Sequence, residues 1–199
     1  GPAEMCAGKA DNVYKTEHSM SNYIWPISSG GTITDGGTAT DSTITVTWTT
    51  SGTKNIGIRY DDTNGCTSAS VTVYPVTVNP LPVPTITGAI TACEGETDVV
   101  YTTQAGMTNY QWDVSAGGTI TSPADNNSIN VTWTTAGSQT VSVNYINSNG
   151  CTADAPTVNN ITVNTTPVPI LIGDISACSG TDGHIYTTDV GMTNYVWTV

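Results

Sequence analysis

The sequence contains no phenylalanine and little charge, and positive charge is the scarcest component of all. Lys and Arg together number 4 against 16 Asp and Glu, so the 199 residues carry a formal net charge of −12. Because nucleic-acid binding depends on clustered Lys and Arg, we expect the chain to bind no nucleic acid. No run approaches the roughly 18 consecutive apolar residues of a membrane-spanning helix, so membrane insertion is not expected either.

Threonine is the residue type that the sequence has in excess. There are 38 Thr, together with 20 Gly and 10 Pro. Thr is β-branched and stiff at its first side-chain torsion, so it favours strands over helices, and it makes an exposed strand face polar without adding charge. This composition predicts an all-β protein.

An internal repeat of about 85 residues is the strongest pattern in the chain. Three residue types recur at spacings of 87 and then 85 positions: Cys6, Cys93 and Cys178; Met20, Met107 and Met192; Trp25, Trp112 and Trp197. A unit of this length has the size of a domain, which favours tandem domains over a solenoid of short turns. We therefore predict domains at 1–80 and 81–165 and a domain fragment at 166–199, joined by the Pro-rich segments 78–84 and 163–169.

The ends of the chain do not coincide with these joints. The first unit is expected to lack its first strand, the third to be the N-terminal part of a repeat, and Gly1-Pro2 resembles a protease-cleavage scar. We expect the chain to be a piece of a longer array. Because an exposed sheet edge accepts an added strand, the apolar segment 168–177 is predicted to complete the first domain of another copy, by head-to-tail strand exchange.

Alternating apolar residues mark the strands of each complete unit. Ile129, Val131 and Trp133 alternate with polar residues, and the same period continues after a short turn, as expected for a hairpin with one buried face. About seven such strands per unit predict a two-sheet sandwich of the immunoglobulin-like class. We predict that four tryptophans form the cores rather than a sugar-stacking surface: Trp25, Trp48, Trp112 and Trp133.

Each complete unit carries two cysteines, and their number suggests a pairing within each unit. Cys6 and Cys66 are 60 positions apart, and Cys93 and Cys151 are 58 apart, so disulfides Cys6–Cys66 and Cys93–Cys151 are predicted, with Cys178 left over. A bridge that closes such a loop stabilises a domain by roughly 3–4 kcal/mol in the chain-entropy model. Zinc is disfavoured because no two cysteines have the close spacing of zinc ligands. Disulfides indicate an oxidising location outside the cytoplasm.

Several sequence words are shared with a known family. They include the Pro-Val-Pro joint, the strand at 109–114, Gly117-Gly118-Thr119-Ile120, the strand at 129–133 and Asn149-Gly150-Cys151. Together they resemble the PKD-like, immunoglobulin-like tandem repeats of large Bacteroidota cell-surface proteins, the gliding-motility adhesin type exported by the type IX system. The resemblance implies a secreted or cell-surface array without enzymatic activity. PKD domains often carry Trp-Asp-Phe-Gly-Asp-Gly, of which Trp112-Asp113 keeps only the start, so no site is carried over.

Acidic residues at two turns offer oxygen ligands of the kind that calcium takes: Asp61, Asp62, Glu94, Glu96 and Asp98. Neither group recurs in the other unit, which favours solvated turns over a calcium site, so no metal or other cofactor is predicted. The two histidines, His18 and His184, occupy different repeat positions and do not indicate a nucleophile with its base. We expect no catalytic residues.

These observations favour an extended spacer that holds an adhesive or enzymatic end away from the cell. Its first partners are then the neighbouring repeats of the same chain. Two alternatives remain open. The loops at 28–41 and 115–126 differ between the units, which suits a module that binds surface glycans or proteins. The repeats also suit accessory domains of a secreted hydrolase.

Overall fold

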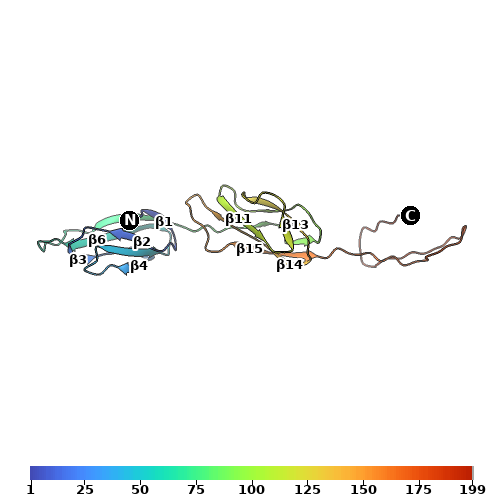
Figure 1. Ribbon diagram of the computed structural model, residues 1–199, viewed down its shortest axis with the longest axis horizontal. Coiled ribbons are helices and arrows are strands. Elements are labelled where there is room, and N and C mark those ends of the chain that lie inside the picture. The colour runs from blue at the N-terminus through green and yellow to red at the C-terminus, as the bar shows by residue number, and fades with distance from the viewer. Residues whose placement is uncertain (199) are drawn as a thin grey trace.

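The computed structural model describes residues 1–198, and Val199, the last residue of the predicted third unit, lies outside the described residues. Two β-sandwiches follow one another along the molecule and are followed by a third segment without named strands (Figure 1). The described residues contain no helix with the length and apolar character that crossing a membrane requires. The all-β class and the tandem immunoglobulin-like sandwiches are confirmed.

The first sandwich packs a four-stranded sheet, in the order β1-β7-β6-β3, against a three-stranded sheet, in the order β2-β5-β4. All neighbours are antiparallel except β1 and β7, which pair in parallel. The strands are β1 (Glu4–Cys6), β2 (Asn12–Lys15), β3 (Ser21–Ile24), β4 (Gly31–Gly36), β5 (Thr43–Trp48), β6 (Gly52–Asp61) and β7 (Thr72–Asn79).

The second sandwich repeats this plan with one additional strand. Its sheets have the orders β9-β15-β14-β11 and β8-β10-β13-β12, and β9 pairs in parallel with β15 as β1 does with β7. The strands are β8 (Thr87–Gly88), β9 (Thr91–Cys93), β10 (Val99–Thr102), β11 (Thr108–Val114), β12 (Gly118–Ile120), β13 (Ser128–Trp133), β14 (Gly137–Ile146) and β15 (Thr157–Asn164).

The cores follow from strict alternation in the central strands. In β5 and in β13, every second side chain is buried and the residues between them are half-buried, ending on the fully buried Trp48 and Trp133. Trp25 and Trp112 are also buried, each in the core of its own sandwich. Because successive strand residues face opposite sides, the alternation in β5 and β13 turns the last residue of each strand, Trp48 or Trp133, into the core.

The first sandwich has a counterpart of β9, namely β1, but the described residues hold no counterpart of β8. The strand without a counterpart is therefore β8, the two-residue first strand of the second sandwich. In the second sandwich, β8 pairs with β10 only at Tyr101↔Gly88 and Thr102↔Thr87. The matching edge strand of the first sandwich is β2, which pairs with β5 among the named strands, and Gly1 lies beside its Tyr14 as Gly88 lies beside Tyr101. Strand exchange between copies at this edge stays a prediction.

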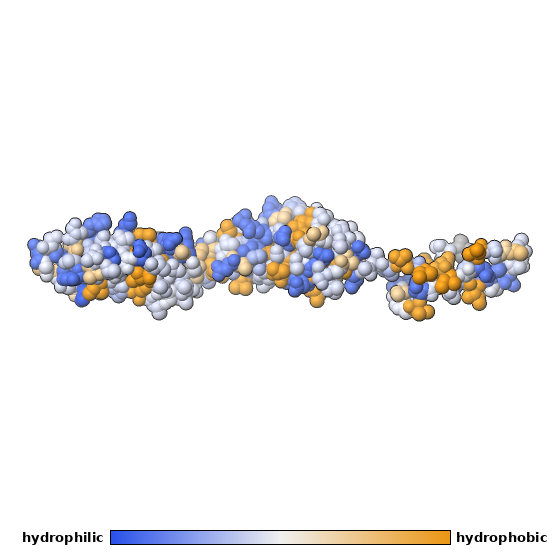
Figure 2. Space-filling model, turned by 60° about the horizontal axis from the view of Figure 1, so that its bottom comes forward, coloured by the Kyte–Doolittle hydropathy of each residue, from blue (hydrophilic) through white to orange (hydrophobic). Residues whose placement is uncertain are grey.

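The third segment, 166–198, contains one isolated β-bridge, Ile172↔Thr187. Apolar groups are clustered on its surface, seen as orange patches at the right of Figure 2. Trp197 is 53% exposed, whereas Trp112 at the same repeat position is 9% exposed. A hollow of about 700 Å³ lies between Pro167 and Thr198 in this segment. Three of its lining residues, Leu171, Tyr195 and Trp197, match Ile86, Tyr110 and Trp112, which belong to or pack against the core of the second sandwich. The hollow is therefore lined in part by apolar groups that a complete sandwich covers.

Candidate functional site

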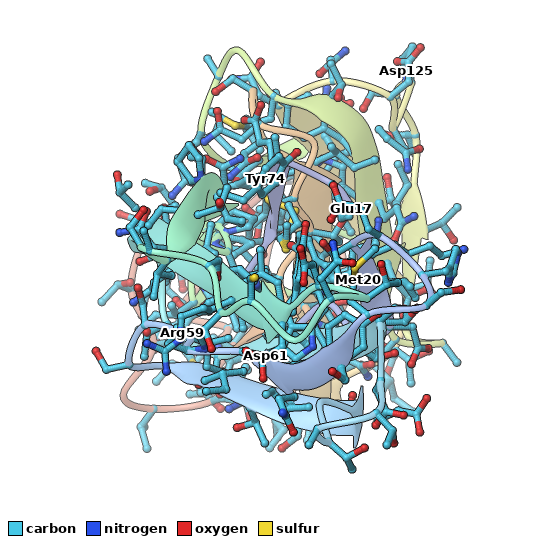
Figure 3. All side chains as sticks on the ribbon, turned by 90° about the vertical axis from the view of Figure 1, so that its left-hand side faces the viewer. Glu17, Met20, Arg59, Asp61, Tyr74 and Asp125 are labelled. Atoms are coloured by element: carbon cyan, nitrogen blue, oxygen red, sulfur yellow. A yellow bond between two sulfur atoms is a disulfide. The ribbon has the colours of Figure 1, made fainter. Side chains whose placement is uncertain are left out.

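The first group of predicted ligand residues lies at the end of the first sandwich viewed in Figure 3, where Arg59 and Asp61 are labelled. Asp61 accepts a hydrogen bond of 2.7 Å from Nδ2 of Asn22 on the neighbouring strand. Hydrogen bonds from Asn22 and Thr67 lower the pKa of Asp61 below its ordinary value. This carboxylate joins β3 to β6 and is already engaged with protein groups.

Asp62 forms the turn that follows β6. Its Oδ1 accepts hydrogen bonds of 2.8 Å from the backbone N–H groups of Asn64 and Cys66. The bond from Cys66 is the main cause that lowers the pKa of Asp62 below its ordinary value of 3.8. In the second sandwich the amide oxygen of Asn147 accepts the same two bonds, at 3.0 Å, from Asn149 and Cys151. The role therefore needs an oxygen and not a charge.

This equivalence predicts the effect of substitutions at Asp62. Asp62→Asn is expected to keep the turn, and Asp62→Ala to open it, so that the Cys66 amide exchanges hydrogen faster only in the alanine variant. Because the folded pKa is lowered, Asp62 stabilises the fold above its ordinary pKa, and this contribution is lost as the pH falls through the lowered value. The amide resonance of Cys66 should follow that titration in the natural chain and not in the asparagine variant. Equal exchange in both variants would contradict the assignment.

The second group of predicted ligands also closes a turn. Glu96 accepts a hydrogen bond of 2.8 Å from the backbone N–H of Cys93, and the N–H of Glu94 donates to the carbonyl of Asn164. Asp98 adopts a left-handed backbone with φ of 56°. Among residues 1–198, no three His, Cys, Asp or Glu side chains converge as metal ligands do. That these residues form solvated turns and not a calcium site stays a prediction.

The recurring Met-x-Asn-Tyr word proves to be a local clamp. In the second sandwich, the hydroxyl of Tyr110 donates to the carbonyl of Gln104 at 2.8 Å and accepts the N–H of Met107 at 3.1 Å. Asn109 has a φ of 50°, which asparagine tolerates better than most residues, and lies at an irregularity in the pairing of β11. The same bonds recur at Tyr23 and Tyr195. The motif recurs because its hydrogen bonds fix the turn that leads into the strand.

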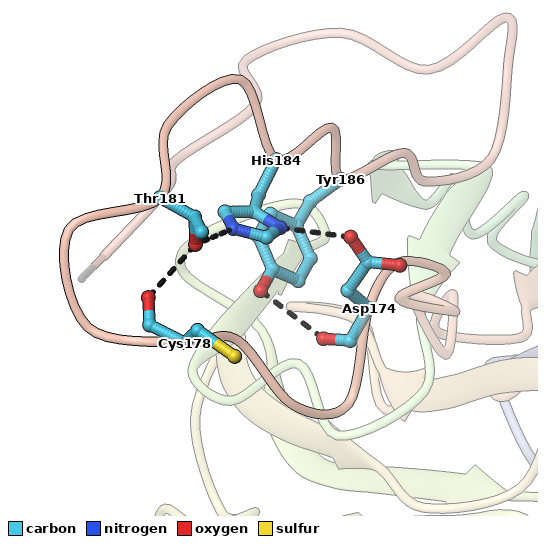
Figure 4. Close-up of polar contacts among 5 residues, drawn as sticks. All are labelled: Asp174, Cys178, Thr181, His184 and Tyr186. Atoms are coloured by element: carbon cyan, nitrogen blue, oxygen red, sulfur yellow. Dashed lines mark hydrogen bonds and ion pairs between the residues drawn. The ribbon is translucent and has the colours of Figure 1, made fainter.

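A hydrogen-bonded chain in the third segment has the residue types of a catalytic triad (Figure 4). His184 lies 2.8 Å from Asp174 through Nδ1 and 2.7 Å from the Thr181 hydroxyl through Nε2. The Thr181 hydroxyl also donates to the carbonyl of Cys178 at 2.8 Å. Both His184 and Asp174 are accessible to solvent. The positions that match His184 in the other repeats hold Asn12 and Val99. These hydrogen bonds therefore close a local turn and are not a property of the repeat.

The cysteines are paired differently from the sequence-based prediction. One disulfide joins Cys6 to Cys151, with Cα atoms 5.6 Å apart, while Cys66, Cys93 and Cys178 are free and exposed. The predicted bridges Cys6–Cys66 and Cys93–Cys151 are therefore wrong. The one bridge that forms connects the two sandwiches.

The predicted bridges cannot form because a long strand separates the two cysteines of each unit. Cys6 pairs in register with Asn79, at the end of the sandwich where β6 begins, and Cys66 follows the other end of β6. The 10 residues of β6 separate these ends by about 30 Å, far beyond the Cα distance of about 7 Å that a disulfide can span. The same holds for Cys93 and Cys151 at the two ends of β14.

The linker between the sandwiches is held to the second one. Gln104 Nε2 donates to the carbonyl of Val83 at 3.1 Å, and the N–H of Thr85 donates to Gln104 Oε1 at 3.0 Å. The hydroxyl of Thr157 donates to the carbonyl of Pro84 at 2.6 Å. Residues 80–82 are therefore the part of the linker between the end of β7 and Val83, the first linker residue that is hydrogen-bonded to the second sandwich. These three residues and the Cys6–Cys151 bridge are here called the junction, and it is the feature with the clearest functional consequence.

Comparison with known proteins identifies one family. The family described as PKD-like domain matches residues 1–76 and again residues 79–161. These two matches coincide with the two sandwiches. No curated protein matches the sequence.

The chain is also similar to parts of several solved structures. The chain is similar to the D00-D0 domain of intimin at 14% identity, covering 81% of this chain and 95% of that one with a TM-score of 0.41. It is similar to the fibronectin(III)-like modules of Clostridium thermocellum CbhA at 18% identity, covering 82% and 90%, with a TM-score of 0.32. Domains 4 and 5 of the S-layer protein SbsC give 14% identity over 74% and 73%, with a TM-score of 0.29.

Proposed function

The chain belongs to the PKD-like domain family, and we propose that it is a non-enzymatic structural module of a secreted or cell-surface protein, in which consecutive sandwiches form a stiff spacer. Domains of this family generally act as structural units and not as catalysts. A role in a large adhesin, which the sequence words indicated, is part of the same proposal.

The observation that carries the proposal is the junction. Flexible joints between domains consist of long, polar, unattached linkers, because such a chain samples many conformations. Here the free part is Pro80-Leu81-Pro82, and each proline fixes one backbone torsion. The bridge adds a second covalent connection between the sandwiches. Two connections remove rotations that one linker would allow, which supports an extended and directed arrangement.

The surface composition suits an extracellular spacer. Few lysines and arginines are available to trypsin-like proteases, and the net charge of −12 opposes association of copies with one another. The disulfide requires an oxidising compartment, which supports an extracellular or cell-surface location.

Small-angle X-ray scattering of the oxidised chain tests the spacer. We expect a narrow distribution of distances between the two sandwiches, and a broader one for the double variant Cys6→Ser/Cys151→Ser. The matched control is Cys66→Ser/Cys93→Ser/Cys178→Ser, which removes only free thiols and should scatter like the natural chain. A distribution in the bridged chain as broad as that of a flexibly linked pair would contradict the proposal.

A second candidate function rests on the loop between β4 and β5. The strand β4 has 6 residues against 3 in β12, and a hollow of about 500 Å³ lies between Asp35 and Thr43. Differences confined to one loop of a repeated frame suit recognition of a glycan or a protein. A glycan array probed with the chain, once with calcium and once with EDTA, tests this. Saturable binding lost on deleting Gly36-Gly37 would favour a binding module, and binding lost in EDTA would assign calcium to it.

A further inference from the structure

We propose that the Cys6–Cys151 bridge is one instance of a repeating bond, and that Cys66 and Cys93 are its two halves at the adjoining junctions. The partner of each is the thiol of a cysteine in a neighbouring repeat: a Cys6-type thiol of the preceding repeat for Cys66, and a Cys151-type thiol of the following repeat for Cys93. This inference does not depend on the spacer role, since an array that binds glycans could be bridged in the same way.

Cys66 is presented by the same turn as the bridged Cys151. The carbonyl of Cys66 accepts the N–H of Asp62 at 3.0 Å, and the carbonyl of Cys151 accepts the N–H of Asn147 at 2.9 Å. The side-chain oxygen at the first position accepts the cysteine N–H in both turns. The residue before each cysteine is a glycine in left-handed conformation, with φ of 78° at Gly65 and 76° at Gly150. The backbone therefore holds the two cysteines alike.

Cys93 is presented by the same strand end as the bridged Cys6. Cys6 lies opposite Asn79 and Cys93 opposite Asn164, each at the end of a parallel pair of strands. Three further hydrogen bonds recur around the two cysteines: Ala7 and Glu94 to the asparagine carbonyls, Gly8 and Gly95 to the carbonyls of Trp48 and Trp133, and Lys9 and Glu96 to the cysteine carbonyls. The backbone therefore holds Cys93 as it holds Cys6, with one side-chain difference: Glu96 accepts the N–H of Cys93, and Lys9 takes the place of Glu96 beside Cys6.

The two kinds of cysteine lie at opposite ends of each sandwich. Cys66 is exposed at the end of the first sandwich that faces away from the second, and Cys93 is exposed where the chain leaves the second sandwich for the third segment. Each sandwich thus carries one half of the bond at either end. A contact of this head-to-tail kind repeats without closing on itself, as in a filament.

The bond forms by thiol–disulfide exchange. One cysteine thiolate attacks the disulfide of an oxidant, either a protein or a small molecule, forms a mixed disulfide and releases one thiolate of the oxidant. The second cysteine thiolate then attacks the protein sulfur of the mixed disulfide and releases the other thiolate. The two cysteines lose two protons and two electrons in total, and the oxidant is reduced to its thiol form.

The test uses the full chain, extended after Val199 by a second copy of residues 115–165. This addition completes the third unit on the pattern of the second and supplies one new cysteine, the copy of Cys151. After folding in a glutathione redox buffer, free thiols are alkylated and disulfide-linked peptides are identified by mass spectrometry. We expect the copy of Cys151 to be linked to Cys93, about tenfold more often than to Cys178, with Cys66 still alkylated.

The variant Cys93→Ser of the extended chain is the matched control, and its added cysteine should be free. A link from the added cysteine to Cys178 that is as frequent as the link to Cys93, or a Cys93 that stays mainly free in the extended chain, would overturn the proposal.

If circular dichroism shows that the added residues do not fold, the unextended chain answers the same question. Cys93→Ser/Cys178→Ser leaves Cys66 as the free thiol, and Cys66→Ser/Cys178→Ser leaves Cys93, while the bridge of the junction stays intact. The two variants are mixed in the same redox buffer. Mixed Cys66–Cys93 dimers above their statistical share of about half support the proposal, and a statistical share overturns it.

Discussion

Replacing Trp133 by alanine is expected to destabilise the second sandwich by about 3–5 kcal/mol, which is most of the stability of a domain of this size. Trp133 is fully buried and packs edge-on against Tyr101, with ring centroids 6.4 Å apart. Its indole N–H donates to the Tyr101 hydroxyl at 3.3 Å. On its other side lies Gly118, where even a Cβ would come within 2.6 Å of the ring. The site can neither close around a small residue nor give up its hydrogen bond without cost.

Denaturant unfolding followed by circular dichroism measures this effect. Trp48→Ala should destabilise the first sandwich by a similar amount. In each variant, about half of the circular-dichroism change should therefore occur at a lower denaturant concentration, and a different sandwich should unfold early in each. The control is Val100→Ala, on the neighbouring strand but 49% exposed, which should change stability by about 0.5 kcal/mol or less. A loss below about 1 kcal/mol for Trp133→Ala would show that the indole is not central to the core.

Pulling the chain from its two ends is expected to give the largest effect of the junction. The Cys6–Cys151 bond joins positions 145 residues apart, so tension applied at the termini passes through it and bypasses the residues between the two cysteines. Reduction should release about 500 Å of additional contour length, at about 3.5 Å per residue. Force spectroscopy with handles at the termini, in the presence and absence of a reductant, measures this release.

The double variant Cys6→Ser/Cys151→Ser should show the long extension without any reductant. The variant Cys66→Ser/Cys93→Ser, which keeps the bridge, should stay short until it is reduced. Release of the additional length of about 500 Å in the oxidised natural chain would place the load on the backbone between the two cysteines and refute the bypass.

The strands could be predicted from the sequence because their signal is local. Ile129, Val131 and Trp133 alternate within six residues, and one face of a sheet is all that such a pattern needs to specify. The four tryptophans were predicted in the core, and they are buried in the structure. The acidic turns were also interpretable, since Asp62 and Asn147 replace each other at one repeat position, which favours a hydrogen-bonding role.

The disulfide could not be predicted from counting cysteines, because pairing depends on where the strand ends lie in space. A count of two per repeat suggested a bond within the repeat. The length of β6 argues against that bond, since its 10 extended residues separate Cys66 from the end of the sandwich that holds Cys6. The contact to Cys151 also depends on the short attached linker, whose hydrogen bonds to Gln104 and Thr157 have no local sequence signature.

The parallel pairing of β1 with β7 gives the molecule a tolerance to being cut. Cys6 is fixed beside the last strand of its own sandwich and bonded to the next one, so residues 6–151 form a closed covalent ring. A protease that hydrolyses one peptide bond in this ring opens the ring but leaves all atoms on a single molecule. Two cuts in the ring are needed to release a fragment. In a longer array with the same bond at each junction, the rings overlap, because Cys93 lies inside the ring that Cys6 and Cys151 close. A nick between sandwiches would then leave the two ends of the array connected.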